Sequence, residues 1–309
     1  MSVTVADVIS WVREEVLDDN DSQKYLWSNA ELIHLLNRAY NEIFKATLQR
    51  KDQTTVAIVE IKLLSNLGIY ALDSRIIQVN NARLETDTTR GPLLKTSERV
   101  LDGTVSDWRN ETGIPREYCP GAYSGYLSVY PKFDDEGEIT GSSNITFVAA
   151  TKTISKVAGD FSDLEVGDEI NISGTVSNNG VKTVATAGTT SIVVSEALVN
   201  EANTNATIRK VRDTLLMSVD RLPTTRFVVG DIEAATVITE LREDHIDGLA
   251  DGIAKRAYLK GDTYTYYPQK AAHHKAEFEE FKKEARRDMI LLHKPDRTRV
   301  PRSGTSIGY

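Results

Sequence analysis

One group of residues near the end of the chain has the types that bind metal ions. His273 and His274 are followed by Glu277, and in a helix His273 and Glu277 lie one turn apart, where they could share a metal ion. No third ligand stands at a matching spacing, and His274 falls on the apolar stripe of the helix that we predict here. The pattern therefore favours one core-facing and one solvated histidine, and we expect no metal site.

Two other segments resemble parts of ligand sites but lack essential residues. The run Asp18–Asp21 is acidic like a calcium loop, but it has neither the mid-loop glycine nor the terminal glutamate of an EF-hand, so we predict a solvated turn. The stretch Gly91–Thr96 ends in Lys-Thr like a phosphate loop but lacks the glycine before Lys95. Neither segment predicts a bound cation or nucleotide.

Catalytic patterns are absent from the sequence. There is no Gly-x-Ser-x-Gly motif, and the carboxylates of Asp134, Asp135 and Glu136 stand beside a glycine, where a turn explains them better than acid–base chemistry. The single cysteine, Cys119, excludes a disulfide framework and is expected to be a small buried apolar residue. We therefore predict no catalytic residues, no cofactor and no enzymatic activity.

Composition and charge restrict the possible partners. The chain has 309 residues and a net charge of −8, which argues against tight coating of nucleic acid. Its last 19 residues, 291–309, carry four basic residues and one acidic residue, so a short basic tail follows an acidic body. No apolar run is long enough to span a membrane, and no secretory signal opens the chain, so we expect synthesis and assembly in a reducing cytoplasm.

The periodicity of apolar residues predicts helices at both ends of the chain. Thr4 precedes a first helix, and Ser28 with Glu31 forms a capping box for a second, with Trp27 and Leu32 placed for a hydrophobic staple. Two more helices close the chain before an irregular tail. The first of these carries Gly248 and Gly252, which allow a neighbour to approach closely and would suit packing between copies in a ring.

Between these helices the pattern of apolar residues is typical of β-structure, and the amino-acid composition changes at residue 142. Residues 142–210 contain no Trp, Tyr, His, Cys, Pro or Met and are rich in Thr, Ser, Asn, Val and Ile. Alternating runs at Ile145–Val148, Glu169–Ile172, Val181–Val184 and Ile192–Val194 predict strands of a small all-β module. We interpret it as a domain inserted at a loop tip.

The segment Asp107–Pro131 contains four of the twelve tyrosines and three of the eight prolines. Ala122–Tyr130 predicts a hairpin that turns at Ser124–Gly125. We expect Tyr118, Tyr126 and Tyr130 to fill the base of this hairpin and to stiffen the joint that leads to the inserted module.

These elements together predict an α+β fold. It consists of a helical bundle from the N- and C-terminal helices, a small β-sandwich or barrel, and the inserted all-β module. The predicted domains are a core of helices and β-sheet at 1–141 and 211–290, an inserted β domain at 142–210, and an extended tail at 291–309.

The order of elements resembles that of head-to-tail adaptor (connector) proteins of tailed bacteriophages. The resemblance covers residues 1–141 and 211–309. The segments that carry it are Thr4–Ile9, Trp27–Ile33, Leu36–Ile43, Asp107–Tyr118, Leu127–Pro131 and Ala254–Tyr258, followed by a long helix with Phe278 and Phe281.

This resemblance implies a virion protein at the head–tail junction. Copies would form a homo-oligomeric ring, commonly a dodecamer, that lies beneath the portal protein, extends the DNA channel and docks a downstream tail or nozzle protein. Genomic DNA would pass without sequence-specific binding, and no membrane is involved. Members often grip the portal with their C-terminal segment, here Leu291–Tyr309, and the residues expected to do so are Lys294, Arg297, Arg299, Arg302 and Tyr309.

Two other functions remain open at the level of sequence. The chain could be a tail or baseplate protein whose inserted β domain binds a glycan on the host surface, although Phe147 and Phe161 are the only aromatic residues in that domain. An enzyme of unknown type is the third possibility, for which no set of residues fulfils the required roles.

Overall fold

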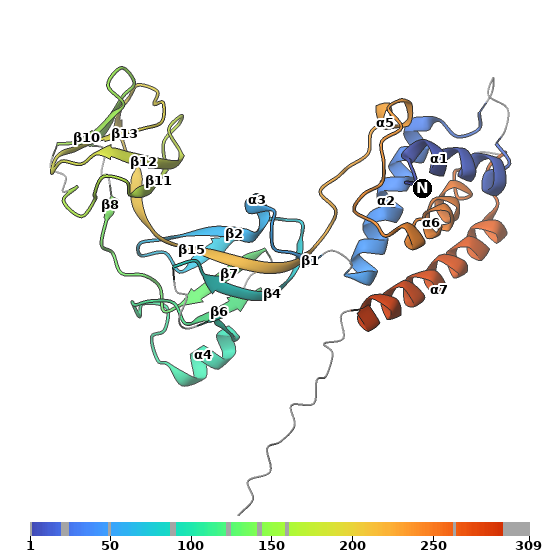
Figure 1. Ribbon diagram of the computed structural model, residues 1–309, viewed down its shortest axis with the longest axis horizontal. Helices are drawn as coiled ribbons and strands as arrows, with labels where there is room; N and C mark the ends of the chain where they lie inside the picture. The colour runs from blue at the N-terminus through green and yellow to red at the C-terminus, as the bar shows by residue number, and fades with distance from the viewer. Residues whose placement is uncertain are drawn as a thin grey trace, which may run out of the picture. The chain divides into compact units, whose positions relative to one another are not determined.

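The computed structural model of the chain describes residues 2–19, 25–48, 51–86, 91–121, 125–140, 144–157, 161–261 and 264–292 (Figure 1). Its contacts divide the chain into two compact units, and each is described by itself. The helical unit combines Met1–Arg50 with Arg221–Tyr309, and the β unit is Lys51–Asp220. The domain boundaries expected from the sequence, near residues 141, 210 and 290, follow a change of composition and remain a prediction.

The helical unit is built from both ends of the chain. The predicted helix starts are confirmed, because Thr4 and Ser28 each form a capping box with the carboxylate three residues later. The elements are α1 (Val5–Trp11), which continues as the π-helix η1 (Val12–Leu17), α2 (Asn29–Thr47), α5 (Gly230–Glu233), the 3-10 helix η2 (Glu243–His245), α6 (Gly248–Ala257) and α7 (Pro268–Leu292).

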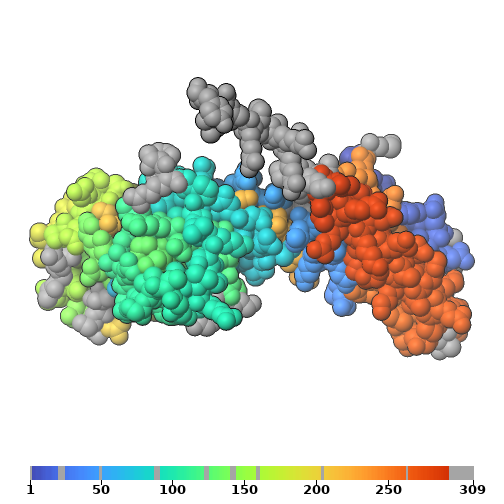
Figure 2. All heavy atoms as spheres, turned by 90° about the horizontal axis from the view of Figure 1, so that it is seen from below, coloured from blue at the N-terminus to red at the C-terminus, as the bar shows by residue number. Residues whose placement is uncertain are grey.

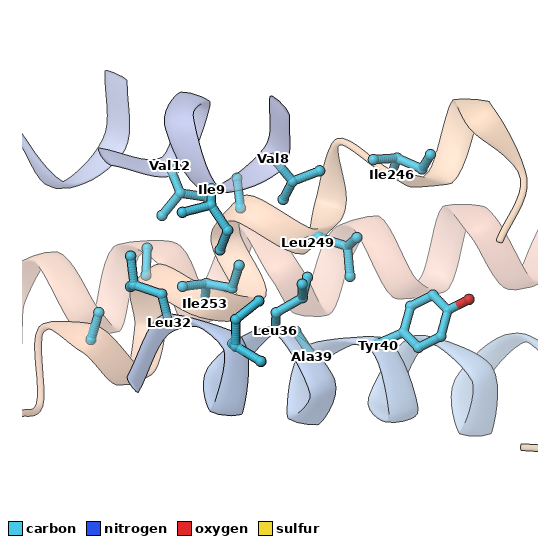
Figure 3. Close-up of a cluster of buried hydrophobic side chains, with 14 of the residues drawn as sticks. Val8, Ile9, Val12, Leu32, Leu36, Ala39, Tyr40, Ile246, Leu249 and Ile253 are labelled. Atoms are coloured by element: carbon cyan, nitrogen blue, oxygen red, sulfur yellow. The ribbon is translucent and has the colours of Figure 1, made fainter. Parts of the chain in front are cut away.

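One hydrophobic cluster holds this unit together. Figure 3 shows Val8 and Ile9 of α1, Leu36 of α2 and Leu249 and Ile253 of α6 pointing toward one another. All five side chains are buried, as the predicted apolar stripes require. Figure 2 shows α7 lying over one face of the helical unit.

The two glycines of α6 serve packing within the chain. A Cβ on Gly252 would lie 2.6 Å from Cβ of Ala39 and 2.8 Å from Cε2 of Phe278, and a Cβ on Gly248 would meet the ring of Phe281. The close neighbours are thus α2 and α7 of the same chain. The expectation that these glycines serve contacts between copies is wrong, because both backbones are already covered.

The predicted solvated turn after the first helix is also wrong for Asp19. Asp19 is buried and forms an ion pair with the equally buried Arg13, and it accepts a hydrogen bond from the backbone N–H of Leu26 at 2.8 Å. Arg13 also donates to the carbonyl oxygen of Trp27 at 2.7 Å. This pair ties η1 to the chain segment that enters α2. Asn20 and Asp21 lie outside the described residues.

The described part of the β unit contains two sheets and two short helices. A four-stranded sheet has the order β3-β7-β6-β5, and an eleven-stranded sheet is centred on the long strand β15. The elements are β1 (Lys51–Asp52), α3 (Val56–Val59), β2 (Glu60–Leu64), β3 (Ile69–Ala71), β4 (Ile76–Leu84), β5 (Leu94–Lys95), α4 (Glu98–Thr104), β6 (Glu117–Pro120), β7 (Tyr126–Tyr130), β8 (Glu138–Thr140), β9 (Ile145–Val148), β10 (Thr153–Lys156), β11 (Glu169–Ser173), β12 (Gly180–Thr186), β13 (Ser191–Val194), β14 (Glu201–Thr204) and β15 (Thr207–Arg221).

The predicted fold class, a helical bundle with a small β-sandwich or barrel and a separate all-β insert, is wrong. The described structure is dominated by β-sheet. The reason is β15, which pairs antiparallel with β8 and β11 through its first residues and with β2 and β1 further along, while β4 also pairs with it. Strands of the expected insert and of the expected core therefore share one large sheet.

The strands predicted within residues 142–210 are nevertheless found. Their inward side chains form a hydrophobic cluster that includes Ile145, Phe147, Phe161 and Ile170. A second cluster lies under β2, β4, β7 and the later part of β15. The large sheet thus runs over two separate cores that one strand connects.

The tyrosine-rich segment supplies β6 and β7 of the small sheet. Tyr118 is buried at 1% exposure, and Tyr130 packs edge-on against Trp108 with ring centroids 6.3 Å apart. Tyr126 is 44% exposed, so it does not fill the base of the hairpin as expected. The hairpin arms begin earlier than predicted, at Glu117, and Ser124 lies outside the described residues.

Candidate interaction surface

The residues expected to grip a portal belong to the segment 291–309. Lys294, Arg297, Arg299, Arg302 and Tyr309 all lie outside the described residues. Their assignment rests on the sequence and remains a prediction. The described part of the chain offers a different candidate surface, which lies where α6 connects to α7.

This surface, which we call the aromatic end, consists of Leu259, Tyr264, Tyr266, Tyr267 and Lys270. The three tyrosines are 76%, 55% and 50% exposed, and Leu259 is 53% exposed. Tyrosine and leucine side chains with this exposure are sites where apolar area is left for a partner to cover. Lys270 adds a positive charge, and its Nζ lies 5.5 Å from the ring centroid of Tyr267.

The buried ring of Tyr258 forms a firm base under the aromatic end. Its hydroxyl donates to the carbonyl oxygen of Val16 at 2.6 Å, and its ring meets those of Trp27 and Tyr267 edge-on at 6.1 Å each. The ring of His274 stacks on it at 5.6 Å with an interplanar angle of 13°. Tyr267 is therefore anchored on a packed aromatic cluster.

The predicted role of His274 as a core-facing residue agrees with this packing. Its Nδ1 lies 2.8 Å from Oδ1 of Asp251, so the ring is held between a carboxylate and Tyr258. His273 is exposed, as expected for the solvated member of the pair. Within the described ranges, no group of three or more His, Cys, Asp or Glu side chains could hold a metal ion.

A hollow of about 420 Å³ adjoins the aromatic end between α6 and α7. Leu259, Pro268, Ala271 and Ala272 supply its apolar wall, and the charged residues Lys255, Arg256 and Lys275 stand around it. A second hollow of about 380 Å³ lies between α2 and α6 and shares Arg256 with the first. The first hollow is open because α7 carries the small residues Ala271 and Ala272 at its wall, where larger side chains would fill the space.

Part of the positive charge around these hollows is neutralised within the chain. Glu42 of α2 accepts a hydrogen bond from Nζ of Lys255 at 2.6 Å and pairs with Arg256. Burial opposes the ionisation of Glu42, but the hydrogen bonds from Lys255 and Arg256 outweigh it and hold the pKa of the carboxyl below its usual value. Burial in turn lowers the pKa of Lys255.

Lys270 and Lys275 contribute the charge that remains for a partner. In the part of the chain that the structure describes, neither ammonium has a carboxylate within ion-pair distance, and both side chains are exposed. The aromatic end is thus apolar at its centre and positive at its border. Such a composition suits an apolar partner surface that carries carboxylates.

Other candidates from the sequence are explained by structure alone. Cys119 is buried beside Leu101 and Trp108, and burial raises the pKa of its thiol to about 11, so it is not a thiolate at neutral pH. Asp134 and Glu136 pair with Arg212 at 3.3 and 2.8 Å. Among the described helices, none combines the length and apolar character needed to cross a membrane.

A cluster of tyrosines in the sequence marks the aromatic end, although the periodicity of apolar residues does not reveal it. Tyr264, Tyr266 and Tyr267 fall within four residues, immediately before Pro268 at the first position of α7. A proline at a helix start marks a turn, and aromatic residues in a turn have no apolar stripe to join.

Comparison with models of protein families identifies a relationship for the first half of the chain. A family model described as SU10 adaptor protein matches residues 3–169. The match therefore includes α1, α2 and more than half of the β unit, up to the first residue of β11. No curated protein matches the chain.

Proposed function

The chain belongs to the SU10 adaptor protein family, a bacteriophage adaptor-type family of virion proteins, and on this basis we propose that it is the head-to-tail adaptor of a tailed phage. In this proposal it has no enzymatic activity, and its copies form a ring, dodecameric as in the proteins it resembles, beneath the portal. The ring extends the DNA channel and docks the next tail or nozzle protein. The family match over residues 3–169 is the observation that carries this proposal.

The proposed portal contact is made by the basic tail. Lys294, Arg297, Arg299 and Arg302 would pair with carboxylates of the portal, with Tyr309 adding an apolar contact. Arginine forms two parallel hydrogen bonds to one carboxylate, so three arginines offer geometry as well as charge. The acidic body would favour passage of DNA without binding, since DNA affinity depends on clustered cations.

Binding to purified portal rings tests this function. The full chain is expected to co-sediment with portal rings, and electron microscopy should show an added ring on one side. Deletion of residues 291–309 should leave a folded protein that binds the portal at least about tenfold more weakly. A control with Arg297→Lys, Arg299→Lys and Arg302→Lys keeps the charge but removes the paired hydrogen bonds, and we expect an intermediate affinity.

Two results would overturn the proposal. If the full chain neither binds portal rings nor occurs in virions at the head–tail junction, the adaptor function is wrong. If the deletion variant binds with unchanged affinity, the tail is not the portal contact. The glycan-binding alternative gains no support, because Phe147 and Phe161 are both buried at 1% exposure and offer no ring for a sugar.

A further inference from the structure

A second exposed apolar surface of the helical unit surrounds α5. This surface, which we call the acidic end, consists of Val228, Val229, Asp231, Glu233 and Val237. The three valines are 59%, 41% and 37% exposed, so solvent covers apolar area that could pack against a partner. The two carboxylates give this surface the charge opposite to that of the aromatic end.

The acidic end has a fixed shape. The carboxylate of Asp231 accepts hydrogen bonds from the backbone N–H of Val228 at 2.6 Å and from Oγ1 of Thr236 at 2.8 Å. The backbone N–H of Thr236 also donates to the carbonyl oxygen of Asp231 at 3.0 Å. These bonds close the turn around α5, so a partner would not have to order it on binding.

The acidic end and the aromatic end lie at opposite ends of the α1–η1 helix. The backbone N–H of Val5 donates to the carbonyl oxygen of Thr236 at 2.9 Å, which joins the start of α1 to the acidic end (Figure 1). The hydroxyl of Tyr258 donates to the carbonyl oxygen of Val16 at 2.6 Å, which joins the end of η1 to the base of the aromatic end. The helix from Val5 to Val16, α-helical to Trp11 and π-helical beyond it, therefore separates the two surfaces.

The two surfaces thus match each other in chemistry and adjoin opposite ends of the α1–η1 helix. One has exposed valines with carboxylates, and the other has exposed tyrosines and a leucine with ammonium groups. The two surfaces cannot contact each other within one copy, since the helix between them holds them apart. Both surfaces are covered by a complementary partner when the acidic end of one copy binds the aromatic end of another.

We propose that copies of this chain associate head to tail, with the acidic end of one copy docked on the aromatic end of the next. The inference rests on the proposed function in one respect, because it names the neighbour in the ring as the partner of the aromatic end. Contacts between two different surfaces repeat from copy to copy, and they close into a ring when the rotation allows it. The contact therefore specifies how a ring of identical subunits is propagated.

Complementary charge variants test the contact with purified full-length protein. The first variant reverses the aromatic end with Lys270→Glu and Lys275→Glu, and the second reverses the acidic end with Glu233→Lys and Ala234→Lys. Sedimentation velocity over a concentration series should show self-association of the wild type and a loss of about tenfold or more in each variant alone, because like charges then face each other. An equimolar mixture of the two variants should regain association, since each reversed surface meets its complement.

A matched control carries Lys283→Glu and Arg287→Glu on α7, with the same charge change as the first variant. Both side chains are exposed and lie about two turns or more beyond Lys275, so this control should associate like the wild type. A wild type that stays monomeric at every concentration overturns the proposal. Variants that associate as the wild type does, or a mixture that does not regain association, also overturn it and leave a different protein as the partner of the aromatic end.

Incorporation into virions separates this inference from the proposed function. If the control variant enters the head–tail junction and the first variant does not, the head-to-tail contact is supported. If both enter and form the same ring, the contact is wrong and the adaptor function stands. If the wild type is absent from the junction, the adaptor function fails, while sedimentation of the purified chain still decides the contact.

Discussion

The segment Asp107–Pro131 and the aromatic end are both rich in tyrosine, but they use these residues differently. In the first, Tyr118 is buried in the core of the β unit and Tyr130 packs on Trp108 and donates to Glu111 at 2.7 Å. In the second, Tyr264, Tyr266 and Tyr267 stand at the surface. Both segments are rich in aromatic residues, so aromatic content alone does not indicate a binding surface.

The difference arises from the backbone that carries the tyrosines. In β6 and β7, successive side chains point to opposite faces of the sheet, and both faces are covered. Tyr118 lies in the cluster formed with other strands, whereas Tyr130 packs against the separate cluster that includes Leu101. Between α6 and α7, the chain turns so that Thr265 is buried while Tyr264 and Tyr266 on either side of it are exposed. A tyrosine in a turn remains exposed unless another element lies over it.

The largest effect is expected at the buried tyrosine of the β unit. Tyr118→Ala should lower the free energy of unfolding by about 4 kcal/mol, because a large buried side chain leaves a cavity. Its hydroxyl also donates to the carbonyl oxygen of Asn80 at 3.3 Å, which the variant loses. Urea denaturation measures the change. Tyr126→Ala, in the same hairpin but exposed, is the control, and an equal loss in both variants would contradict the comparison.

A smaller loss of stability is expected where α6 packs closely against α2 in the helical unit. Gly252→Ala places a methyl group 2.6 Å from Cβ of Ala39, and neither helix can retreat without disturbing Phe278. The gain in helix propensity is about 1 kcal/mol, but overpacking costs more, so we expect a net loss of about 2 kcal/mol. Urea denaturation measures it, with Gly261→Ala as the control because nothing lies within 4 Å of that Cβ position.

The pH dependence of the free energy of unfolding tests the environment of His245, a buried residue of the helical unit. His245 is buried, its ring lies edge-on to Phe281 at 5.9 Å, and neither ring nitrogen has a hydrogen-bond partner among the described residues. Burial lowers the pKa of His245 from 6.5, and Arg242 acts in the same direction, while Asp244 and Asp288 oppose the shift. The unfolded chain therefore binds a proton at a higher pH than the folded chain does.

The sign of the effect follows from this order of proton binding. Stability from the neutral ring is fully present above pH 6.5 and is lost as the pH falls from there through the lowered pKa of the folded state. Urea midpoints measured over this range should decline with falling pH in the wild type. His245→Phe keeps the ring contact and removes the titration, so its decline should be shallower, and an identical decline would contradict the assignment.

The parts of the fold that were predicted correctly are those determined by residues close together in the sequence. Ser28 and Glu31 are three residues apart, and their capping box is found at the start of α2. The run Ile145–Val148 matches β9 at both ends. Caps and strand alternation depend on neighbours in the sequence, so they can be recognised without the rest of the chain.

The parts that the sequence did not predict depend on contacts between distant residues. Nothing near Thr207 indicates that β15 pairs with Glu138–Thr140 at one end and with Lys51–Asp52 at the other, and this pairing determines the fold class. The burial of Asp19 likewise depends on Arg13, and the covering of Gly252 depends on Ala39 and Phe278. The sequence does show three tyrosines directly before the proline that starts α7. Whether those side chains are exposed depends on whether another element covers them, and the local sequence does not determine that.

The smallest effect on stability, and the sharpest test of the comparison, is expected from the exposed tyrosines. Tyr264→Ser with Tyr266→Ser should change the free energy of unfolding by no more than about 0.5 kcal/mol, because neither side chain fills a core. The same pair should weaken association between copies by about tenfold, since exposed tyrosines at the centre of a contact carry much of its energy. Urea denaturation and sedimentation on the same samples measure both quantities. A marked loss of stability would mean that these tyrosines act as Tyr118 does, and unchanged association would mean that their exposure serves no contact between copies.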